Sequence, residues 1–181
     1  MTVLLGGAAA ASASSALISI HAARAHPGEG RGVERGERRM LRVPVEGLAP
    51  GEAIRSQELI LNTDSQALRY ALSSASVDED GKGIHDILRV VIRTADLGSG
   101  STPSCERFDG PTIYRGPLGS QTAGFGDVRT GGQPGDRVLA SGEGETLCFE
   151  VTMPLSAGNE YQGASGSTTW ALAAEQAAAN P

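Results

Sequence analysis

The sequence has few of the features that carry chemistry. It contains two cysteines and three histidines, and it has no CxxC, HExxH or GxSxG motif. Without closely spaced cysteines a tetrahedral zinc site is not expected, and the other two absences argue against the common metalloprotease and serine hydrolase arrangements. Carboxylates are plentiful, but no spacing selects two of them for acid–base work. We therefore expect no enzyme activity, no metal and no cofactor.

The chain also lacks an excess of positive charge. It has 15 Lys and Arg against 21 Asp and Glu, which gives a formal net charge of −6. Nucleic-acid binding needs clustered cations to neutralise phosphates, so no nucleic-acid partner is expected. The run of arginines from Arg31 to Arg42 is interleaved with glutamates and is typical of a solvated mixed-charge segment. His85, beside Asp86, is expected to be a solvated loop histidine without a catalytic role.

Long apolar runs are missing after the first twenty residues. Thr2–Ile20 is apolar and rich in small residues, and it is similar to an export signal that leads into an A-x-A cleavage zone, either at Ala9–Ala13 or at Ala23–Ala25. The positive residues that usually precede such a segment are absent, which leaves open whether Met1 is the true start. No second stretch is long enough to span a bilayer, so the mature chain is not expected to cross a membrane. The export-like segment predicts a protein that is secreted or at the cell surface.

The two cysteines, Cys105 and Cys148, lie far apart in the sequence. One interpretation is a single disulfide in an exported protein. The other is a pair of buried free thiols, as in a cytosolic protein.

The remaining pattern indicates strands. Glycine is abundant, with 25 residues in 181, which favours turns and short strands over long helices. Leu147, Phe149, Val151 and Met153 alternate with polar residues and Cys148, as in a half-buried strand. Similar runs occur over residues 40–48, 54–62, 67–75, 87–95 and 167–176, where Trp170 and Leu172 share a face, and Pro44 suggests an edge strand. About seven short strands with regular turns predict an all-β sandwich.

The segment from Leu59 to Leu72 places two apolar runs around a polar pivot, Asn62–Ser65. Such residues bond their own backbone in turns. The two runs are expected to form either a hairpin or one long bent strand, and they serve as scaffold. The predicted organisation is a signal-like or donor segment (residues 1–25), a linker rich in Gly and charge (26–39) and a sandwich domain (40–181).

Several segments in order resemble the TasA/camelysin family of exported bacterial proteins. PGEAIRSQELILN and LNTDSQALRYAL are similar to the family's Pro-Gly-led strand and to its N-T-G-S-containing strand pair. Cys105, the IYRGPLG segment and ETLCFEV follow in the order seen in actinobacterial relatives, and AEQAAANP is similar to the family's tail. The resemblance covers roughly residues 41–181.

This resemblance implies a jelly-roll-like antiparallel β-sandwich, export through a dedicated signal peptidase and assembly into extracellular fibres of a biofilm matrix. The implied partners are other copies of the chain in a homopolymeric fibre, with a minor anchoring subunit. Strand donation between subunits is the implied mechanism, because main-chain hydrogen bonds give affinity to an added strand. Some members carry a metalloendopeptidase label, for which this sequence has no zinc motif. A monomeric secreted or surface binding module is the alternative.

The candidate donor strand lies in SALISI. Ser14, Ala16, Ile18 and Ile20 alternate with their neighbours, so this segment can lie extended with one apolar face. The competing interpretation is a plain signal peptide with no later role. SALISIHAARA lacks the aromatic residue and the aspartate that the family usually has in this place.

Overall fold

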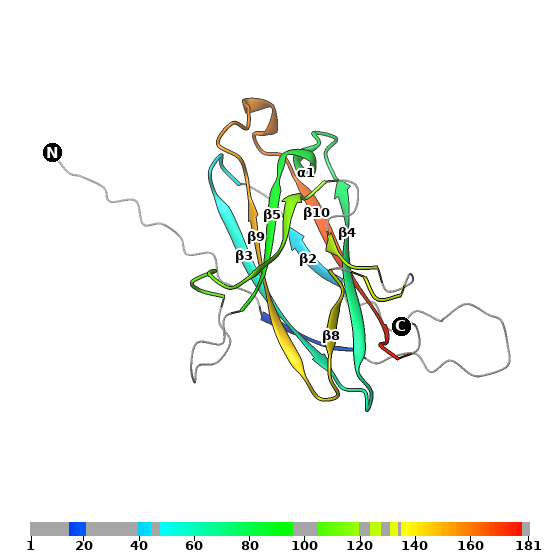
Figure 1. Cartoon of the computed structure of the whole chain (residues 1–181). Helices are drawn as coiled ribbons and strands as arrows, with labels where there is room; N and C mark the ends of the chain where they lie inside the picture. Colours follow the sequence, from blue (N-terminus) through cyan, green and yellow to red (C-terminus); the bar gives the residue numbers. More distant parts are fainter. Residues whose placement is uncertain are drawn as a thin grey trace, which may run out of the picture.

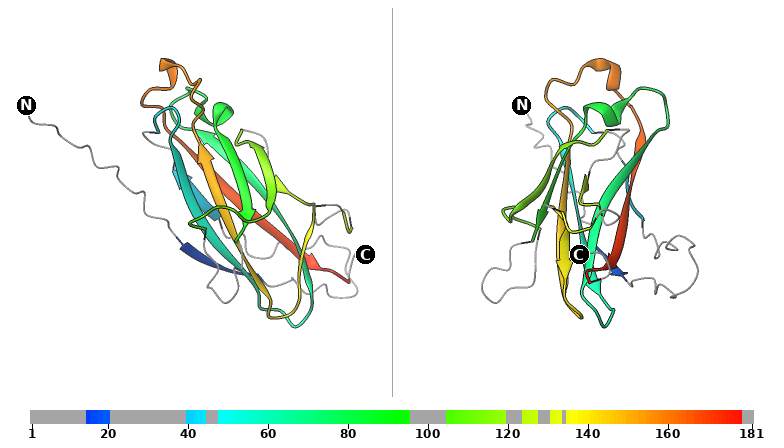
Figure 2. Two further views of the ribbon diagram at one scale, coloured as in Figure 1. Left: turned by 60° about the vertical axis from the view of Figure 1, so that its left-hand side comes forward. Right: turned by 45° about the vertical axis from the view of Figure 1, so that its right-hand side comes forward.

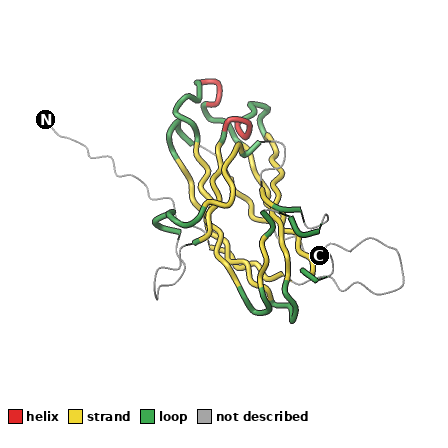
Figure 3. Tube along the Cα trace, viewed as in Figure 1, coloured by secondary structure: helices red, strands yellow, loops and turns green. Residues whose placement is uncertain are grey.

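A computed structural model describes residues 15–20, 40–44, 48–95, 105–119, 124–127, 131–133 and 135–178. Two facing β-sheets account for most of them (Figures 1 and 2). The strands are β1 (Ser15–Ile20), β2 (Met40–Pro44), β3 (Ala53–Asn62), β4 (Leu68–Asp78), β5 (Arg89–Thr94), β6 (Thr112–Pro117), β7 (Gly124–Phe125), β8 (Arg137–Leu139), β9 (Gly144–Thr152) and β10 (Gly166–Gln176). Two short helical turns, α1 (Ile84–Ile87) and η2 (Asn159–Tyr161), lie at one end of the sandwich (Figure 3).

The strand order confirms the jelly-roll expectation. Sheet A has the order β1-β3-β9-β5-β6, and sheet B has the order β2-β10-β4-β7, with β8 also paired to β4. Leaving β1 aside, the strand pairs around which the chain winds are β2 with β10, β3 with β9, β4 with β7 and β8, and β5 with β6. The antiparallel pairs β4–β10 and β5–β9 join them within each sheet. Successive pairs alternate between the two sheets, as in the wrapped strand pairs of a jelly roll. The strand β1 is additional to this arrangement.

The core lies between the sheets and follows the alternation read from the sequence. Leu147, Phe149 and Val151 on β9 are at most 2% exposed. Trp170 and Leu172 on β10 are also buried, and the ring of Trp170 packs against Phe149 with 5.2 Å between ring centroids. As Pro44 suggested, β2 is an edge strand of sheet B.

The segment around Asn62 differs from both expectations. β3 and β4 neither pair as a hairpin nor continue as one strand, because β3 belongs to sheet A and β4 to sheet B. The pivot is therefore a corner between the sheets. The chain crosses back near the same place, since Ala140–Glu143 joins β8 in sheet B to β9 in sheet A.

The side chain of Asn62 locks these two crossings together. Asn62 is fully buried, and its Nδ2 lies 2.8 to 3.0 Å from the carbonyl oxygens of Gln66, Leu139 and Ala140. Its Oδ1 accepts a hydrogen bond from the backbone N–H of Asp64. An amide offers both donors and an acceptor, so asparagine at this position satisfies main-chain groups of both corners.

Replacing Asn62 by alanine should therefore destabilise the fold. We expect the free energy of unfolding to fall by about 2 kcal/mol, because buried carbonyl groups lose their donor. In a domain of this size that corresponds to a melting temperature lower by about 4–8 °C. Thermal unfolding measures the change. Ser65→Ala, at an exposed position of the same turn, is the control and should shift the melting temperature by less than about 2 °C. Equal shifts in melting temperature in the two variants would contradict a stabilising role of the Asn62 side chain at the two corners.

Candidate strand-docking site

The outer edge of β3 carries the added strand β1. β1 lies parallel to β3, with Ser15 opposite Gln57 and Ile20 opposite Asn62 (Figure 1). Without β1, β3 would be the edge strand of sheet A. An uncovered edge presents a row of unpaired N–H and C=O groups to which another strand can add.

The ladder between β1 and β3 has a defined register. Ala16, Ile18 and Ile20 stand opposite Glu58, Ile60 and Asn62 in the ladder. Those three residues of β3 are each at most 2% exposed. Positions 16, 18 and 20 of β1 therefore stand opposite the buried residues of β3. Ser14 and the predicted linker, residues 26–39, lie outside the described residues.

Glu58 is a carboxylic acid that faces the interior at this edge. It is 2% exposed, and neither carboxylate oxygen has a hydrogen-bond partner among the described residues. Its ladder neighbours are Leu147 on β9 and Ala16 on β1. Burial raises the pKa of the Glu58 carboxyl to about 7, because desolvation disfavours the charged form.

Sequence reasoning missed Glu58, although a signal existed. Within β3, Ile54 and Ile60 have the same parity as Glu58 and mark the inward face. A glutamate at an inward position of a strand is unusual, since acidic residues are rarely fully buried unless they are paired. Attention to parity, and not only to the presence of a strand, would have selected this residue.

Cys105 and Cys148 form a disulfide, with 5.4 Å between their Cα atoms. This finding excludes the alternative of two free thiols. Cys148 lies on β9, and the bond attaches the segment that begins at Cys105 to sheet A. Structural disulfides are characteristic of proteins that fold in an oxidising compartment, which fits an exported protein.

Two partly buried polar clusters have their charged groups paired within the cluster. In the first, Glu145 on β9 accepts a bidentate pair of hydrogen bonds from Arg137 on β8, both at 2.6 Å. The buried hydroxyl of Tyr70 on β4 donates to the same carboxylate. Burial, followed by the negative charge of Glu145, raises the pKa of the Tyr70 hydroxyl. This cluster joins the two sheets.

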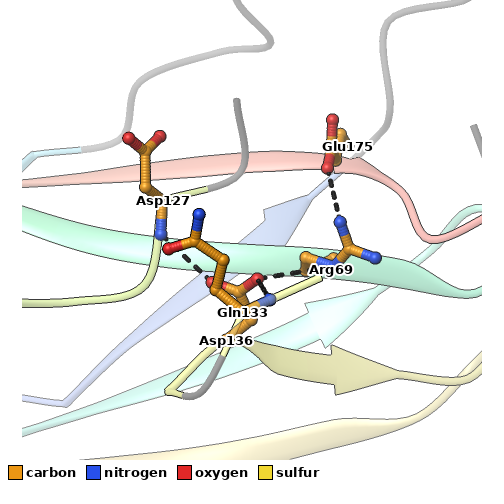
Figure 4. Close-up of polar contacts among 5 residues, drawn as sticks. All are labelled: Arg69, Asp127, Gln133, Asp136 and Glu175. Atoms are coloured by element: carbon orange, nitrogen blue, oxygen red, sulfur yellow. Dashed lines mark hydrogen bonds and ion pairs between the residues drawn. The ribbon is translucent and has the colours of Figure 1, made fainter. Parts of the chain in front are cut away.

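The second cluster holds the glycine-rich segment between β7 and β8 (Figure 4). Arg69 on β4 donates to Glu175, its ladder partner on β10, at 2.9 Å, and its Nε lies 3.6 Å from Asp136. The Asp136 carboxylate accepts hydrogen bonds from the backbone N–H groups of Asp127 and Gln133. Because its charges are paired and hydrogen-bonded, this cluster anchors a loop and presents no reactive group.

The expectation of a solvated His85 is wrong. His85 is 6% exposed and lies in α1, where Ile84 is also buried. The segment after β4 folds back onto the end of the sandwich, and the carbonyl of His85 accepts a hydrogen bond from the N–H of Gly119. Its Nε2 lies 3.6 Å from a carboxylate oxygen of Asp86, whereas Nδ1 has no hydrogen-bond partner among the described residues.

The described part of the chain holds neither a cluster of metal ligands nor a long apolar helix. No group of three or more His, Cys, Asp or Glu side chains there is arranged to hold a metal ion. No helix there has the length and apolar character needed to cross a bilayer.

No protein-family model and no curated protein sequence matches this chain. Among solved structures, the chain is similar to the crystal structure of Aeromonas hydrophila PliG, a periplasmic lysozyme inhibitor of g-type lysozyme. The two are 7% identical, the match covers 88% of this chain and 99% of that one, and the TM-score is 0.30. A likeness at this level identifies neither a family nor a function.

Proposed function

We propose that this protein is an exported structural subunit that polymerises by strand exchange at β3. In the polymer, β1 of one copy pairs with β3 of the next copy and takes the place that the subunit's own β1 occupies in the isolated chain. The observation that carries the proposal is that β1 is additional to a jelly roll whose other strands already form both sheets. β1 can leave its place without breaking any other strand pair.

The energetics of such an exchange depend on concentration. The same ladder forms within a chain or between chains, as in domain swapping, so the two arrangements differ mainly in effective concentration. Residues 21–39 connect β1 to β2, and two binding segments joined by a short linker meet at an effective concentration in the millimolar range. Fully extended, it spans up to about 65 Å, which is enough to reach a neighbouring copy. Polymers are therefore favoured at high local concentration.

The experiment removes β1 from the protein and then restores it. Purified protein at rising concentration is viewed by negative-stain electron microscopy, with light scattering on the same samples. The full chain is expected to form fibres. A chain lacking residues 1–25 should remain folded yet fail to polymerise, and an added peptide covering Ser14–Ala25 should bind it. Fibres from the truncated chain that match those of the full chain would refute strand exchange by β1.

A matched pair of proline variants sharpens this test. Ile18→Pro removes a main-chain donor in the middle of β1, where proline is poorly tolerated in a ladder. It should reduce fibre formation strongly. Ala8→Pro, ahead of the strand, should leave fibres intact. Equal effects of the two prolines would contradict a role for the β1 ladder.

A second candidate is a monomeric exported binding module. It is favoured by the pairing of β1 with β3 of the same chain, which covers the sheet edge. Covered edges are a common protection against association. In that case light scattering would give a monomer mass at every concentration tested.

A further inference from the structure

The outer face of sheet A gathers most of the positive side chains of the sandwich. Between residues 48 and 178 the structure describes eight Arg and Lys residues. Two of them, Arg69 and Arg137, belong to the paired clusters described above, and Lys82 lies in the loop before α1. The other five form the arginine face, which consists of Arg55 on β3, Arg89 and Arg93 on β5, Arg107 in the disulfide-linked segment and Arg115 on β6.

Strand alternation places these side chains together. On β5, Val90 and Ile92 are fully buried, so Arg89, Val91 and Arg93 lie on the opposite, outer face. Arg115 stands opposite Val91 in the β5–β6 ladder and therefore shares that face. Arg89 and Arg93 are about 13 Å apart along the strand, with Arg115 beside the midpoint.

One side of the arginine face is held in place by an aromatic ring. The guanidinium groups of Arg55 and Arg93 lie 5.1 and 5.2 Å from the ring centroid of Phe108. Phe108 has φ 52° and is the only non-glycine residue with positive φ in the described ranges. Such a conformation persists where the surrounding structure imposes it, and the Cys105–Cys148 disulfide attaches this segment to β9.

The arginines of this face differ in whether their charge has a partner. Arg55 is paired with Glu150 at 2.6 Å, and Arg93 donates to the carbonyl of Gly110 at 2.7 Å. Arg89, Arg107 and Arg115 are exposed and have no carboxylate partner among the described residues. Glu150 lies on the same face as the ladder partner of Arg55, and the chain as a whole has a net charge of −6.

The opposite face of the molecule has a different character. On the outer side of sheet B, the positions that alternate with the buried residues of β4 and β10 carry small or apolar uncharged side chains. They are Ser73, Ala75, Val77, Ser167, Thr169, Ala171 and Ala173. The same parity also includes Arg69 and Glu175, which are paired with each other. Between residues 48 and 178, the exposed arginines that the structure describes therefore belong to the arginine face.

We propose that the arginine face binds a linear polyanion whose repeating unit carries a phosphate. Guanidinium groups match phosphate oxygens in a bidentate manner and are weakly hydrated, so they release water readily on binding. Arg89, Arg107 and Arg115 have no carboxylate partner in the described part of the chain, and Arg93 lies about 13 Å from Arg89 along β5. Cations spread over this distance suit several phosphates of one chain better than a single anion. The acidic remainder of the protein would repel a polyanion elsewhere, which restricts binding to this face.

The test uses inorganic polyphosphate as the probe and the full-length protein. Binding to a fluorescently labelled chain is measured at 50 mM salt and at increasing salt. Saturable binding is expected to weaken with salt, with a slope of about −0.7 to −0.9 in log K against log salt for each phosphate neutralised. Orthophosphate at the same total phosphate concentration should not compete. Absence of saturable binding at 50 mM salt, or full competition by orthophosphate, would overturn the proposal.

Matched charge reversals locate the site. Arg115→Glu and Lys82→Glu change the net charge equally, and both positions are exposed. Arg115→Glu should weaken polyphosphate binding at least tenfold, whereas Lys82→Glu should change it less than about twofold. Thermal unfolding checks that both variants are folded. If Arg115→Glu does not fold, Arg89→Glu takes its place. Equal weakening by the two reversals would overturn the proposal. Tighter binding of a single-stranded oligonucleotide of equal charge would also overturn it, because that result points to base contacts.

Discussion

Replacing both cysteines by serine is expected to lower the free energy of unfolding by about 4 kcal/mol. The bond joins residues separated by 43 positions, and in the chain-entropy model a loop of this length gives a stabilisation of about that size. Cys148 is also 2% exposed, so a serine hydroxyl at this position would be buried. Urea unfolding of the double variant and of the parent at pH 7 gives the difference directly. For a chain of this size the melting temperature should fall by about 8–16 °C.

Two controls connect this loss to the bond. Intact mass after alkylation, with and without reductant, should show no free thiol in the parent and two after reduction. Reduced parent protein should unfold at nearly the same urea concentration as the double serine variant. A double variant that loses less than about 1 kcal/mol would show that the segment after Cys105 is held by its other contacts, such as those of Phe108 with Arg55 and Arg93.

Glu58→Gln is expected to remove a pH dependence of stability. The folded-state pKa of Glu58 is raised from 4.5 to about 7, so the folded state holds this proton more tightly than the unfolded state. The favourable contribution is fully present below pH 4.5 and is lost as pH rises through 7. The shift corresponds to about 3 kcal/mol. Glutamine has nearly the same shape as glutamate and does not titrate. Position 58 should therefore contribute no pH dependence to the free energy of unfolding of the variant.

The expected result is a gap between the two proteins that opens with pH. The difference in free energy of unfolding should change by about 3 kcal/mol, in favour of glutamine, between pH 4.5 and pH 8. Urea unfolding at a series of pH values measures it. Glu160→Gln, at an exposed position in η2, is the control and should leave the pH profile of the parent unchanged. Parallel profiles for Glu58→Gln and the parent would refute the role of this carboxyl.

The elements that the sequence predicted well are those whose burial repeats locally. The alternation around Phe149 and Trp170 placed two core strands correctly, because every second residue of a half-buried strand meets the core. The Asn62 corner was not predicted, because its hydrogen bonds join residues nearly 80 positions apart. His85 was misjudged for a related reason, since its burial depends on how the end of the sandwich closes and not on its neighbours in sequence.

The candidate sites show the same division. The apolar period of SALISI could be read directly, but its place beside β3 depends on sheet order. The arginine face could not be read from the sequence, because its members are spread over four separate segments from Arg55 to Arg115. No run of basic residues marks it, and only the jelly-roll topology brings these side chains to one face.

The pairing of β1 with a different strand, β3, would decide how a filament grows. Each subunit would offer one β1 and one β3 edge, and these two surfaces differ, so the contact is heterologous and repeats head to tail. Such a filament is directional. At one terminus of the filament the β3 edge would be free to accept a β1 from another subunit. At the other terminus β1 would be free to pair with the β3 edge of another subunit. A chain with an intact β3 edge but no β1 could join at one terminus only, and it would stop elongation there while the opposite terminus continued to extend.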